Sequence, residues 1–243
     1  LYGREARIFP QYATNSDDTF FSKVIEESKR KYIGILPTGK TTVVTNLQLL
    51  ASLLFARLEI WKKSPDKKEA DNFWTILSYF KSLKEIGRFS NKINSELKPI
   101  IKQLQVRYLN NNSHSERSNY SKLSYRNIEL TSRIPNEKIK KNLDKLEIEF
   151  NGNIKEHNAY DLVLATNMIS VGLDVSRLGL MIMNGMPPNT AEYIQASSRV
   201  ARKNEGLVIT LFDPFNSRDL SYFEDFVQFH KTFYKQVEPL SVT

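Results

Sequence analysis

The stretch DLVLATNMISVGLDVSRLGLMIMNGMPPNTAEYIQASSRVAR, residues 161–202, decides the fold of this chain. It holds two apolar runs of strand length, DLVLAT and LGLMIM, with a polar loop between them. NTAEYIQASSRVAR follows the second run and has the spacing and the start signal of a helix. Buried strands in alternation with helices are typical of a parallel sheet whose two faces are both covered.

The same alternation continues on both sides of this stretch. Further apolar runs of strand length are KYIGIL (31–36), NFWTILSYF (72–80), NIEL (127–130) and GLVITLF (206–212). A stripe of apolar side chains at steps of three and four indicates a long helix, with Val43, Leu47, Leu50, Leu54, Leu58 and Trp61. Other helices are expected at 81–89, 95–109, 136–150 and 221–237, and a loop in the charged run KKSPDKKEAD (62–71). The chain is therefore predicted to be α/β with a mostly parallel central sheet.

The composition is that of an ordinary globular protein with a basic surface. The 243 residues include 35 Lys or Arg and 27 Asp or Glu, which gives a net charge of +8. Phosphate polyanions are the usual partners of such a surface, although a general bias toward lysine gives the same charge. Cysteine is absent and the three histidines are scattered, which excludes disulfides and thiolate metal sites. No apolar run approaches the roughly 18 residues of a membrane span, so no membrane partner is expected.

The predicted helix in NTAEYIQASSRVAR has two different faces. Asn189 and Glu192 form a capping pair at its start. Gln195, Arg199 and Arg202 are spaced i, i+4 and i+7, so we expect them to share one face of the helix. The opposite, core-directed face is expected to hold Tyr193, Ala196 and Val200. Two guanidinium groups beside an amide suit phosphate oxygens, although a solvated arginine face is the commoner role of such residues.

The loop before this helix begins at the end of a buried strand. DLVLAT delivers Thr166 at its carboxyl edge, which is where ligands bind in open α/β sheets. Gly172 allows a close approach that a side chain would prevent. Asp174 offers a carboxylate at the entrance of the next strand.

These residues resemble motifs V and VI of superfamily 2 helicases, written A-T-x5-G-x-D and Q-x-x-G-R-x-x-R. The spacing agrees in both motifs, and the one departure is Ser198, where the family usually has Gly. Weaker similarities are FWTILSYFKSLKEIGR (73–88) to motif IV, and IELTSRIPNEKIKKNLDKLE (128–147) to the strand, turn and helix that follow it. The two flanks are similar to large bacterial helicase-related proteins typified by the helicase-like component of the DISARM antiphage system.

The resemblance implies a RecA-like three-layer fold and the C-terminal motor domain of an ATP-dependent nucleic-acid helicase or translocase. Residues 1–40 are then a lead-in from the preceding domain, and 41–215 are the RecA-like domain with a helical and loop insertion at about 90–126. Residues 216–243 are a C-terminal helical extension. Because the chain begins without Met or a signal peptide, we expect it to be part of a longer, cytoplasmic protein.

The resemblance also implies a role for each motif residue. Arg199 and Arg202 would act as arginine fingers on the γ-phosphate of ATP, with support from Gln195. Gly172 and Asp174 would couple the nucleotide to the nucleic acid. Backbone phosphates would be contacted by Thr166, Ser132 and Ser82. The implied partners are a nucleic acid, DNA more than RNA, and an N-terminal RecA-like domain of the same protein, which would hold most of the ATP and Mg²⁺.

The stretch GILPTGKT, Gly34 to Thr41, matches the phosphate-loop pattern G-x-x-x-x-G-K-[ST]. A genuine phosphate loop needs an acidic pair after a later strand, and no D-E pair follows any apolar run here. Between Lys40 and the motif VI arginines there is also room for only one RecA-like domain of about 150 residues. Pro37 and Gly39 are therefore expected to form the turn before a helix. The alternatives are a self-contained P-loop NTPase that uses Lys40, and a nucleic-acid-binding or scaffold module without ATPase activity.

Overall fold

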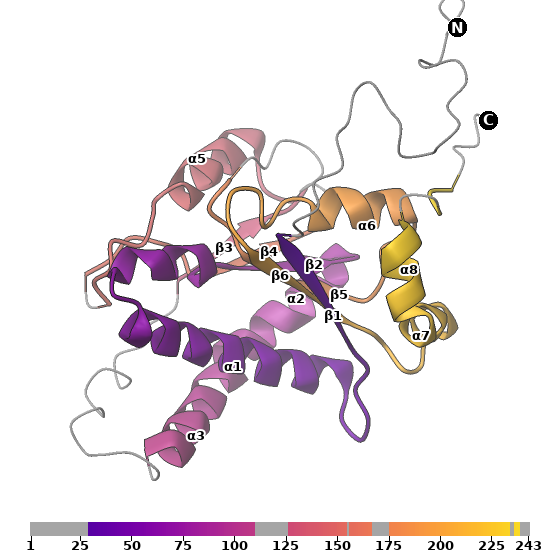
Figure 1. Cartoon of the computed structure of the whole chain (residues 1–243), viewed down its shortest axis with the longest axis horizontal. Helices are drawn as coiled ribbons and strands as arrows, with labels where there is room; N and C mark the ends of the chain where they lie inside the picture. Colours follow the sequence, from indigo (N-terminus) through magenta and orange to yellow (C-terminus); the bar gives the residue numbers. More distant parts are fainter. Residues whose placement is uncertain (1–28, 110–125, 155, 167–174, 234–235, 239–243) are drawn as a thin grey trace, which may run out of the picture.

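The fold is built on one sheet of six parallel strands. The computed structural model describes residues 29–109, 126–154, 156–166, 175–233 and 236–238. Its strands are β1 (Arg30–Ile35), β2 (Ile76–Phe80), β3 (Asn127–Leu130), β4 (Leu162–Ala165), β5 (Leu180–Asn184) and β6 (Gly206–Leu211). They lie in the order β1-β6-β5-β2-β4-β3, and each neighbouring pair is parallel (Figure 1). The predicted α/β class and parallel sheet are confirmed.

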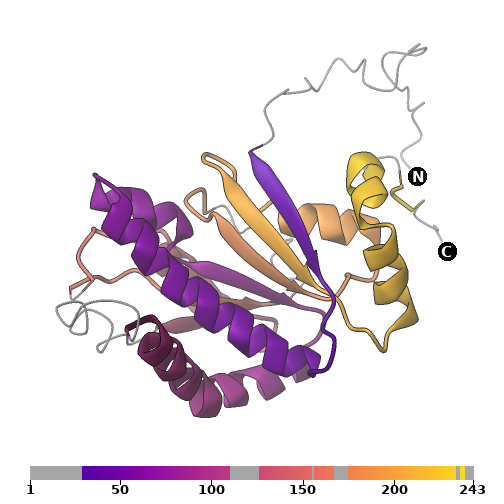
Figure 2. The same cartoon turned by 60° about the horizontal axis from the view of Figure 1, so that its bottom comes forward.

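Helices cover both faces of the sheet and complete three layers (Figure 2). One face is covered by α1 (Thr42–Lys63), α2 (Leu83–Lys92) and α3 (Lys98–Leu109), with a π-helical stretch, Ile93–Leu97, between the last two. The other face is covered by α5 (Asn136–Leu146), α6 (Thr190–Ser197), α7 (Ser217–Glu224) and α8 (Phe226–Thr232). The RecA-like layering that the resemblance implies is therefore present.

The central strand β2 illustrates how the sequence serves both layers. Its side chains alternate between the two faces, as the two-residue period of a strand requires. Ile76 and Phe80 pack with α1 and α2, whereas Leu77 and Tyr79 pack with α6 and its neighbours. All five residues of β2 are buried, which explains why its sequence reads as a continuous apolar run.

Helix α1 lies along one face of the sheet and carries the predicted apolar stripe. Leu47, Leu50, Leu54 and Leu58 are at most 2% exposed. Within the described ranges α1 is the one helix that is long and apolar enough, by length and composition, to cross a membrane. Its contact with the sheet accounts for that composition, because Leu47, Leu50 and Leu54 form the core under β2, β4 and β5.

Two expected elements differ from those observed. The single helix expected at 221–237 is wrong, because α7 ends at Glu224 and its C-cap, Asp225, has a φ of −100° and a ψ of 20° that interrupt the helix before α8 begins. The charged run expected to be a loop contains a short 3-10 helix, Lys67–Phe73. Asp66 starts this helix by accepting a hydrogen bond from the backbone N–H of Lys68, at 2.9 Å.

Elements from the regions expected as lead-in, insertion and extension all contact the central fold. Residues 30–35 form the edge strand β1, which pairs with β6 along its whole length. Helix α3 packs beside α1, and α7 and α8 contribute aromatic side chains to the core. These contacts show where the elements pack, but they do not show where one domain ends and the next begins. The division of the chain into domains therefore stays a prediction.

Candidate functional site

Three of the predicted contact residues follow neighbouring strands at the carboxyl edge of the sheet. Tyr79 of β2 and Leu130 of β3 both lie opposite Ala165 of β4 in the strand register. Thr166 comes directly after β4, and Ser82 and Ser132 come two residues after the ends of β2 and β3. The structure therefore brings Ser82, Thr166 and Ser132 to one edge, over adjacent strands.

The three hydroxyl groups differ in their surroundings. Ser82 is the N-cap of α2, and its Oγ accepts a hydrogen bond from the backbone N–H of Glu85 at 3.3 Å. A hydroxyl that accepts one bond still has its hydrogen to donate, so Ser82 remains able to bind an anion. Ser132 is exposed in the turn after β3. Thr166 is only 5% exposed, so a ligand can touch it at its outer surface alone.

Helix α6 begins as its sequence predicts. Asn189 is the N-cap and accepts a hydrogen bond from the backbone N–H of Glu192 at 2.7 Å. The Glu192 carboxylate accepts a hydrogen bond from the Tyr79 hydroxyl on β2. Burial and this bond raise the pKa of Tyr79 well above its usual value. Tyr193 and Ala196 are buried, which confirms the core-directed face of α6; Val200 is also buried, although it lies beyond the end of the helix.

The shared helical face expected for Gln195, Arg199 and Arg202 is wrong. Helix α6 ends at Ser197, and Ser198 is its C-cap. Ala201 then adopts a left-handed φ of 57°, which no helix continues through. Gln195 is exposed on the last turn of α6, whereas the two arginines lie in the irregular segment that follows.

This irregular segment lies at the amino edge of the sheet. The backbone N–H of Ala201 donates to the carbonyl of Leu178, which precedes β5, at 2.8 Å. Arg202 is exposed, and its Nε donates to the Ser198 carbonyl at 3.3 Å. Arg199 is half-buried. The arginines and the hydroxyl row therefore lie at opposite edges of the sheet, because α6 runs back along it.

Gly172 and Asp174 lie outside the described residues. The chain leaves the carboxyl edge after Thr166 and is described again from Val175, which is buried close to the start of β5. The roles expected for Gly172 and Asp174 stay predictions.

The stretch that resembles a phosphate loop occupies β1, a turn and the cap of α1. Gly34 lies inside β1, where an added Cβ would come within 2.9 Å of the Phe226 ring. Gly39 has a φ of 78°, and Thr41 is the N-cap of α1. The turn that was expected before a helix is confirmed. Lys40 lies against α1, where its Nζ donates to Gln48 Oε1 at 3.1 Å.

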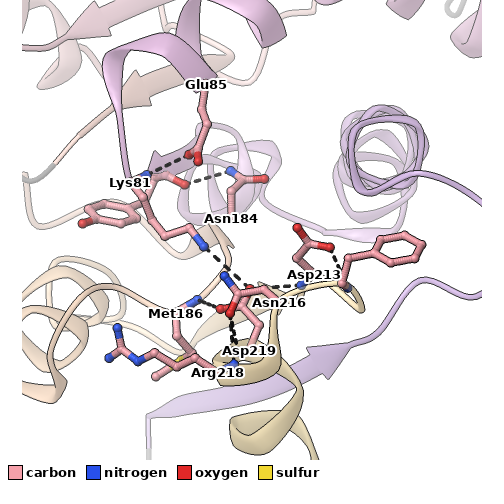
Figure 3. A network of polar contacts seen from close by, with 10 residues as sticks. Lys81, Glu85, Asn184, Met186, Asp213, Asn216, Arg218 and Asp219 are labelled. Carbon is pink, nitrogen blue, oxygen red and sulfur yellow. Dashed lines mark hydrogen bonds and ion pairs between the residues drawn. The ribbon is translucent and has the colours of Figure 1, made fainter.

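A buried carboxylate that the motifs did not predict joins three loops at the carboxyl edge (Figure 3). Asp219 of α7 is 1% exposed, and it accepts hydrogen bonds from the backbone N–H groups of Met186 and Asp213, at 3.2 and 3.0 Å. Lys81 Nζ lies 3.7 Å from the same carboxylate. Gly185 has a φ of 76° and leaves no room for a Cβ beside Asp219. Only Lys81 could have been noticed from the sequence, because it directly precedes Ser82, a residue expected to contact phosphate.

Comparison with known families agrees with the motif pattern. Residues 89–204 match the model of the helicase conserved C-terminal domain. Over 249 aligned residues the chain is 37% identical to the DISARM protein DrmA of Bacillus paralicheniformis, an alignment that includes all of this chain and 21% of DrmA. The chain thus spans about a fifth of the length of this curated relative.

Solved helicases share the fold at low sequence identity. The structure of the DUF1998 helicase MrfA bound to DNA matches with a TM-score of 0.56 and 14% identity, over 88% of this chain and 24% of MrfA. The helicase Lhr of Mycobacterium smegmatis, bound to single-stranded DNA and AMP-PNP, matches with a TM-score of 0.52 and 16% identity, over 88% of this chain and 23% of Lhr. At these identities the likeness shows the fold alone.

Proposed function

Because residues 89–204 match the helicase conserved C-terminal domain and the whole chain aligns with part of DrmA, we propose that the chain is the second motor lobe of an ATP-dependent superfamily 2 helicase or translocase. The site of ATP hydrolysis lies between this lobe and an N-terminal RecA-like lobe of the same cytoplasmic protein. The relationship to DrmA supports a place in an antiphage system of the DISARM type. Closing and opening of the two lobes moves the protein along one strand.

The amino edge of the sheet supplies the nucleotide contacts in this proposal. Arg202 is exposed, and its guanidinium group offers several N–H donors in a fork that suits phosphate oxygens. Arg199 lies three residues before it, and Gln195 is exposed on the last turn of α6. The buried Tyr193 and Val200 anchor this segment, so the arginines can stabilise developing charge without first being ordered. Gly172 and Asp174 complete this side by coupling the nucleotide to the nucleic acid.

The carboxyl edge supplies the nucleic-acid contacts. Ser82, Thr166 and Ser132 donate hydrogen bonds to backbone phosphates, and such contacts position a strand without reading its sequence. The N-terminus of α2, with the positive end of its helix dipole, lies beside Ser82 and also favours an anion there. DNA is the preferred partner in this proposal, as in the solved structure of MrfA.

ATP and Mg²⁺ belong mainly to the partner lobe. Within the described ranges no three Asp, Glu or His side chains converge into a metal site. The donors that this chain offers are cationic, and they suit the γ-phosphate and not the metal. Mg²⁺, when bound by the partner lobe, neutralises charge on the β- and γ-phosphates.

The observation that carries the proposal is the exposed position of Arg202 in the short segment after α6, which Tyr193 and Val200 anchor in the core. In the complete protein, Arg202→Ala should lower kcat by about 10³–10⁵-fold, as for other arginine fingers. Lys203→Ala is the matched control, because Lys203 is the next residue and is also exposed. Steady-state phosphate release measures both variants. An Arg202→Ala protein that turns over like the control contradicts the proposal.

Substitution of Lys40 distinguishes this proposal from the alternative that the chain is a self-contained P-loop NTPase. In that alternative Lys40 binds the β- and γ-phosphates, so Lys40→Ala abolishes turnover. The contact of Lys40 with Gln48 on the side of α1 favours our proposal, which expects Lys40→Ala to change kcat by less than about twofold. A scaffold without ATPase activity predicts no turnover even for the unmodified protein.

A further inference from the structure

A cavity of about 270 Å³ opens at the carboxyl edge of the sheet, between the first turns of α1 and α2. Its apolar lining includes Phe80, Phe89 and Leu211, each at most 3% exposed. Small-molecule pockets usually measure roughly 300–1,000 Å³, so this volume suits a single small planar group and no larger ligand. The motif residues at the two edges of the sheet do not use this cavity.

The wall of the cavity contains a buried hydrogen-bond acceptor, Asn46 Oδ1, that has no donor. Asn184 donates its amide N–H to the Tyr79 carbonyl at 2.8 Å, which turns its oxygen toward Asn46. Asn46 donates its own amide N–H to that oxygen. Asn46 Oδ1 is left without a hydrogen-bond partner, although the residue is 2% exposed and lines the cavity. A buried acceptor without a donor has lost its water and gained no hydrogen bond in return, so a ligand that donates a hydrogen bond here is favoured.

The charges around the cavity disfavour an anion inside it. Three carboxylates line it, from Glu85, Asp213 and Asp219. They face two cations, and Lys81 is already paired with Asp219 at 3.7 Å. The other cation, Arg88, is exposed. A neutral, planar group that carries N–H donors therefore suits the interior, while an anionic group suits the exposed surface beside it.

A nucleobase on a single strand has this combination of properties. Adenine, cytosine and guanine present amino groups as donors, whereas thymine and uracil present carbonyl oxygens at the corresponding positions. Thymine and uracil donate only through N3–H, which is flanked by two carbonyl oxygens, so at least one of these oxygens would face Asn46 Oδ1 or the carboxylates, which are acceptors as well. The cavity also adjoins Ser82, at the start of α2, where the proposed function has a backbone phosphate.

We propose that this cavity receives one unstacked, amino-bearing base of the bound strand, with Asn46 Oδ1 as the acceptor of its amino group. The inference rests on the proposed function, because it requires a strand along the carboxyl edge. It adds a preference for base identity to contacts that otherwise follow the backbone alone. Removing a base from its stack costs a few kcal/mol, so the preference should be modest.

The test uses the complete protein and labelled thymidine oligomers in which one position at a time is dA, dC or an abasic site. Fluorescence anisotropy gives the Kd of each. One net hydrogen bond contributes about 0.5–1.5 kcal/mol, so at one position dA or dC should bind about 2- to 12-fold more tightly than dT. A uridine series with rA or rC substitutions repeats the measurement for RNA.

Asn46→Leu should abolish this preference, because it removes the acceptor and keeps a side chain of similar volume; since it also removes the donor to Asn184 Oδ1, a urea unfolding curve of the variant checks that it is folded. Gln48→Leu is the matched control on the same helix, since Gln48 lies outside the cavity. Val43→Phe provides a second variant, because Val43 lines the cavity and a larger ring should occupy it. Retention of the preference by Asn46→Leu and Val43→Phe would overturn the inference.

The remaining outcomes separate this inference from the proposed function. Binding that weakens steeply with salt but is equal for every base overturns the base site and leaves the helicase proposal standing. No binding to any strand removes both. If Asn46→Leu raises KM for ATP and leaves base preference unchanged, the cavity is a nucleotide site and the inference is wrong.

Discussion

At the residue scale, two glycines with similar left-handed backbones distinguish the cost of the backbone conformation from the cost of steric crowding by neighbouring atoms. Gly39 and Gly185 have φ values of 78° and 76°. A Cβ added to Gly39 meets nothing within 4 Å, whereas at Gly185 it would lie 2.6 Å from an Asp219 oxygen and also against Lys81 Nζ. Gly39→Ala should cost about 1–2 kcal/mol of unfolding free energy, the price of a left-handed conformation.

Gly185→Ala should cost about 1–3 kcal/mol more than Gly39→Ala, because it also overpacks the carboxylate that joins three loops. Urea unfolding of both variants gives the difference directly. Equal losses would show that Asp219 and Lys81 move aside freely, and that the loops in Figure 3 are not held as tightly as the contacts indicate.

The buried pair of Arg57 and Asp161 makes a second prediction at this scale. Arg57 Nη2 lies 2.5 Å from Asp161 Oδ1, and the two side chains are 1% and 0% exposed. Burial lowers the pKa of Arg57, while Asp161 acts in the opposite direction. Arg57→Met should lower the unfolding free energy by about 3–5 kcal/mol, because it leaves a carboxylate buried without its cation. Chemical denaturation measures the loss.

The control for this prediction is the double variant Arg57→Met with Asp161→Asn. Asparagine removes the unpaired charge and keeps an acceptor for the backbone N–H of Arg126, which now lies 2.6 Å from Asp161 Oδ2. The double variant should therefore be more stable than Arg57→Met alone. A double variant of equal or lower stability would mean that lost packing against Trp74, and not charge, causes the effect.

At the scale of the element, α8 is attached to α6 through a histidine. His230 Nδ1 donates to the Phe226 carbonyl at 2.7 Å, so in the neutral ring Nε2 accepts from the Tyr193 hydroxyl at 2.8 Å. Burial lowers the pKa of His230 below its usual 6.5. Burial also lowers the pKa of His157, beside Trp74. Both folded histidines therefore bind a proton less readily than the unfolded chain does.

Stability should consequently fall as the pH drops below about 6.5, toward the lowered folded pKa of each histidine. Each histidine adds at most about 1.4 kcal/mol per pH unit. His230→Gln should reduce the slope of unfolding free energy against pH between about 6.5 and 5.5, and His157→Gln should reduce it separately. An unchanged slope in His230→Gln would contradict the prediction. It would show that α8 has already separated from α6 at the pH values at which the ring is protonated.

The elements that sequence could predict are those whose pattern is set by the sheet. Every residue of β2 and β4 is buried, so both read as plain apolar runs. Asn189 and Glu192 likewise predicted the start of α6 from local hydrogen bonding. Its end was not predictable, because Ala201 takes its left-handed φ in a segment that bonds to Leu178, a contact that no spacing reveals.

The cavity shows a second limit of the same kind. Asn46 looks like one polar residue on an apolar helix, and only its contact with Asn184, 138 residues further along the chain, leaves its oxygen unpaired. Asp219 similarly gains its role from Met186 and Lys81, which come from other loops. Sequence spacing therefore predicted motif residues and missed residues that depend on tertiary contacts.

At the scale of the whole molecule, the two edges of the sheet differ in how much of each proposed binding site they supply. The carboxyl edge is complete within this chain for the proposed strand contacts, since Ser82, Thr166 and Ser132 all follow its own strands. In the proposed function, the amino edge supplies cationic donors to a nucleotide that another lobe holds together with Mg²⁺. Binding of nucleic acid and hydrolysis of ATP should therefore be separable when these 243 residues are prepared alone.

The isolated chain should bind single-stranded DNA and show no appreciable ATP turnover. With a net charge of +8, its binding should weaken steeply with salt, and log K should fall by about 0.7 per log unit of salt for each phosphate contacted. Anisotropy across a salt series measures the slope, and phosphate release with saturating DNA measures turnover.

Single variants Ser82→Ala and Ser132→Ala should weaken binding, while Arg202→Ala should not, because Arg202 lies at the opposite edge. DNA-stimulated hydrolysis by the chain alone would mean that it contains a complete nucleotide site, and the division of labour between the two edges would then be wrong.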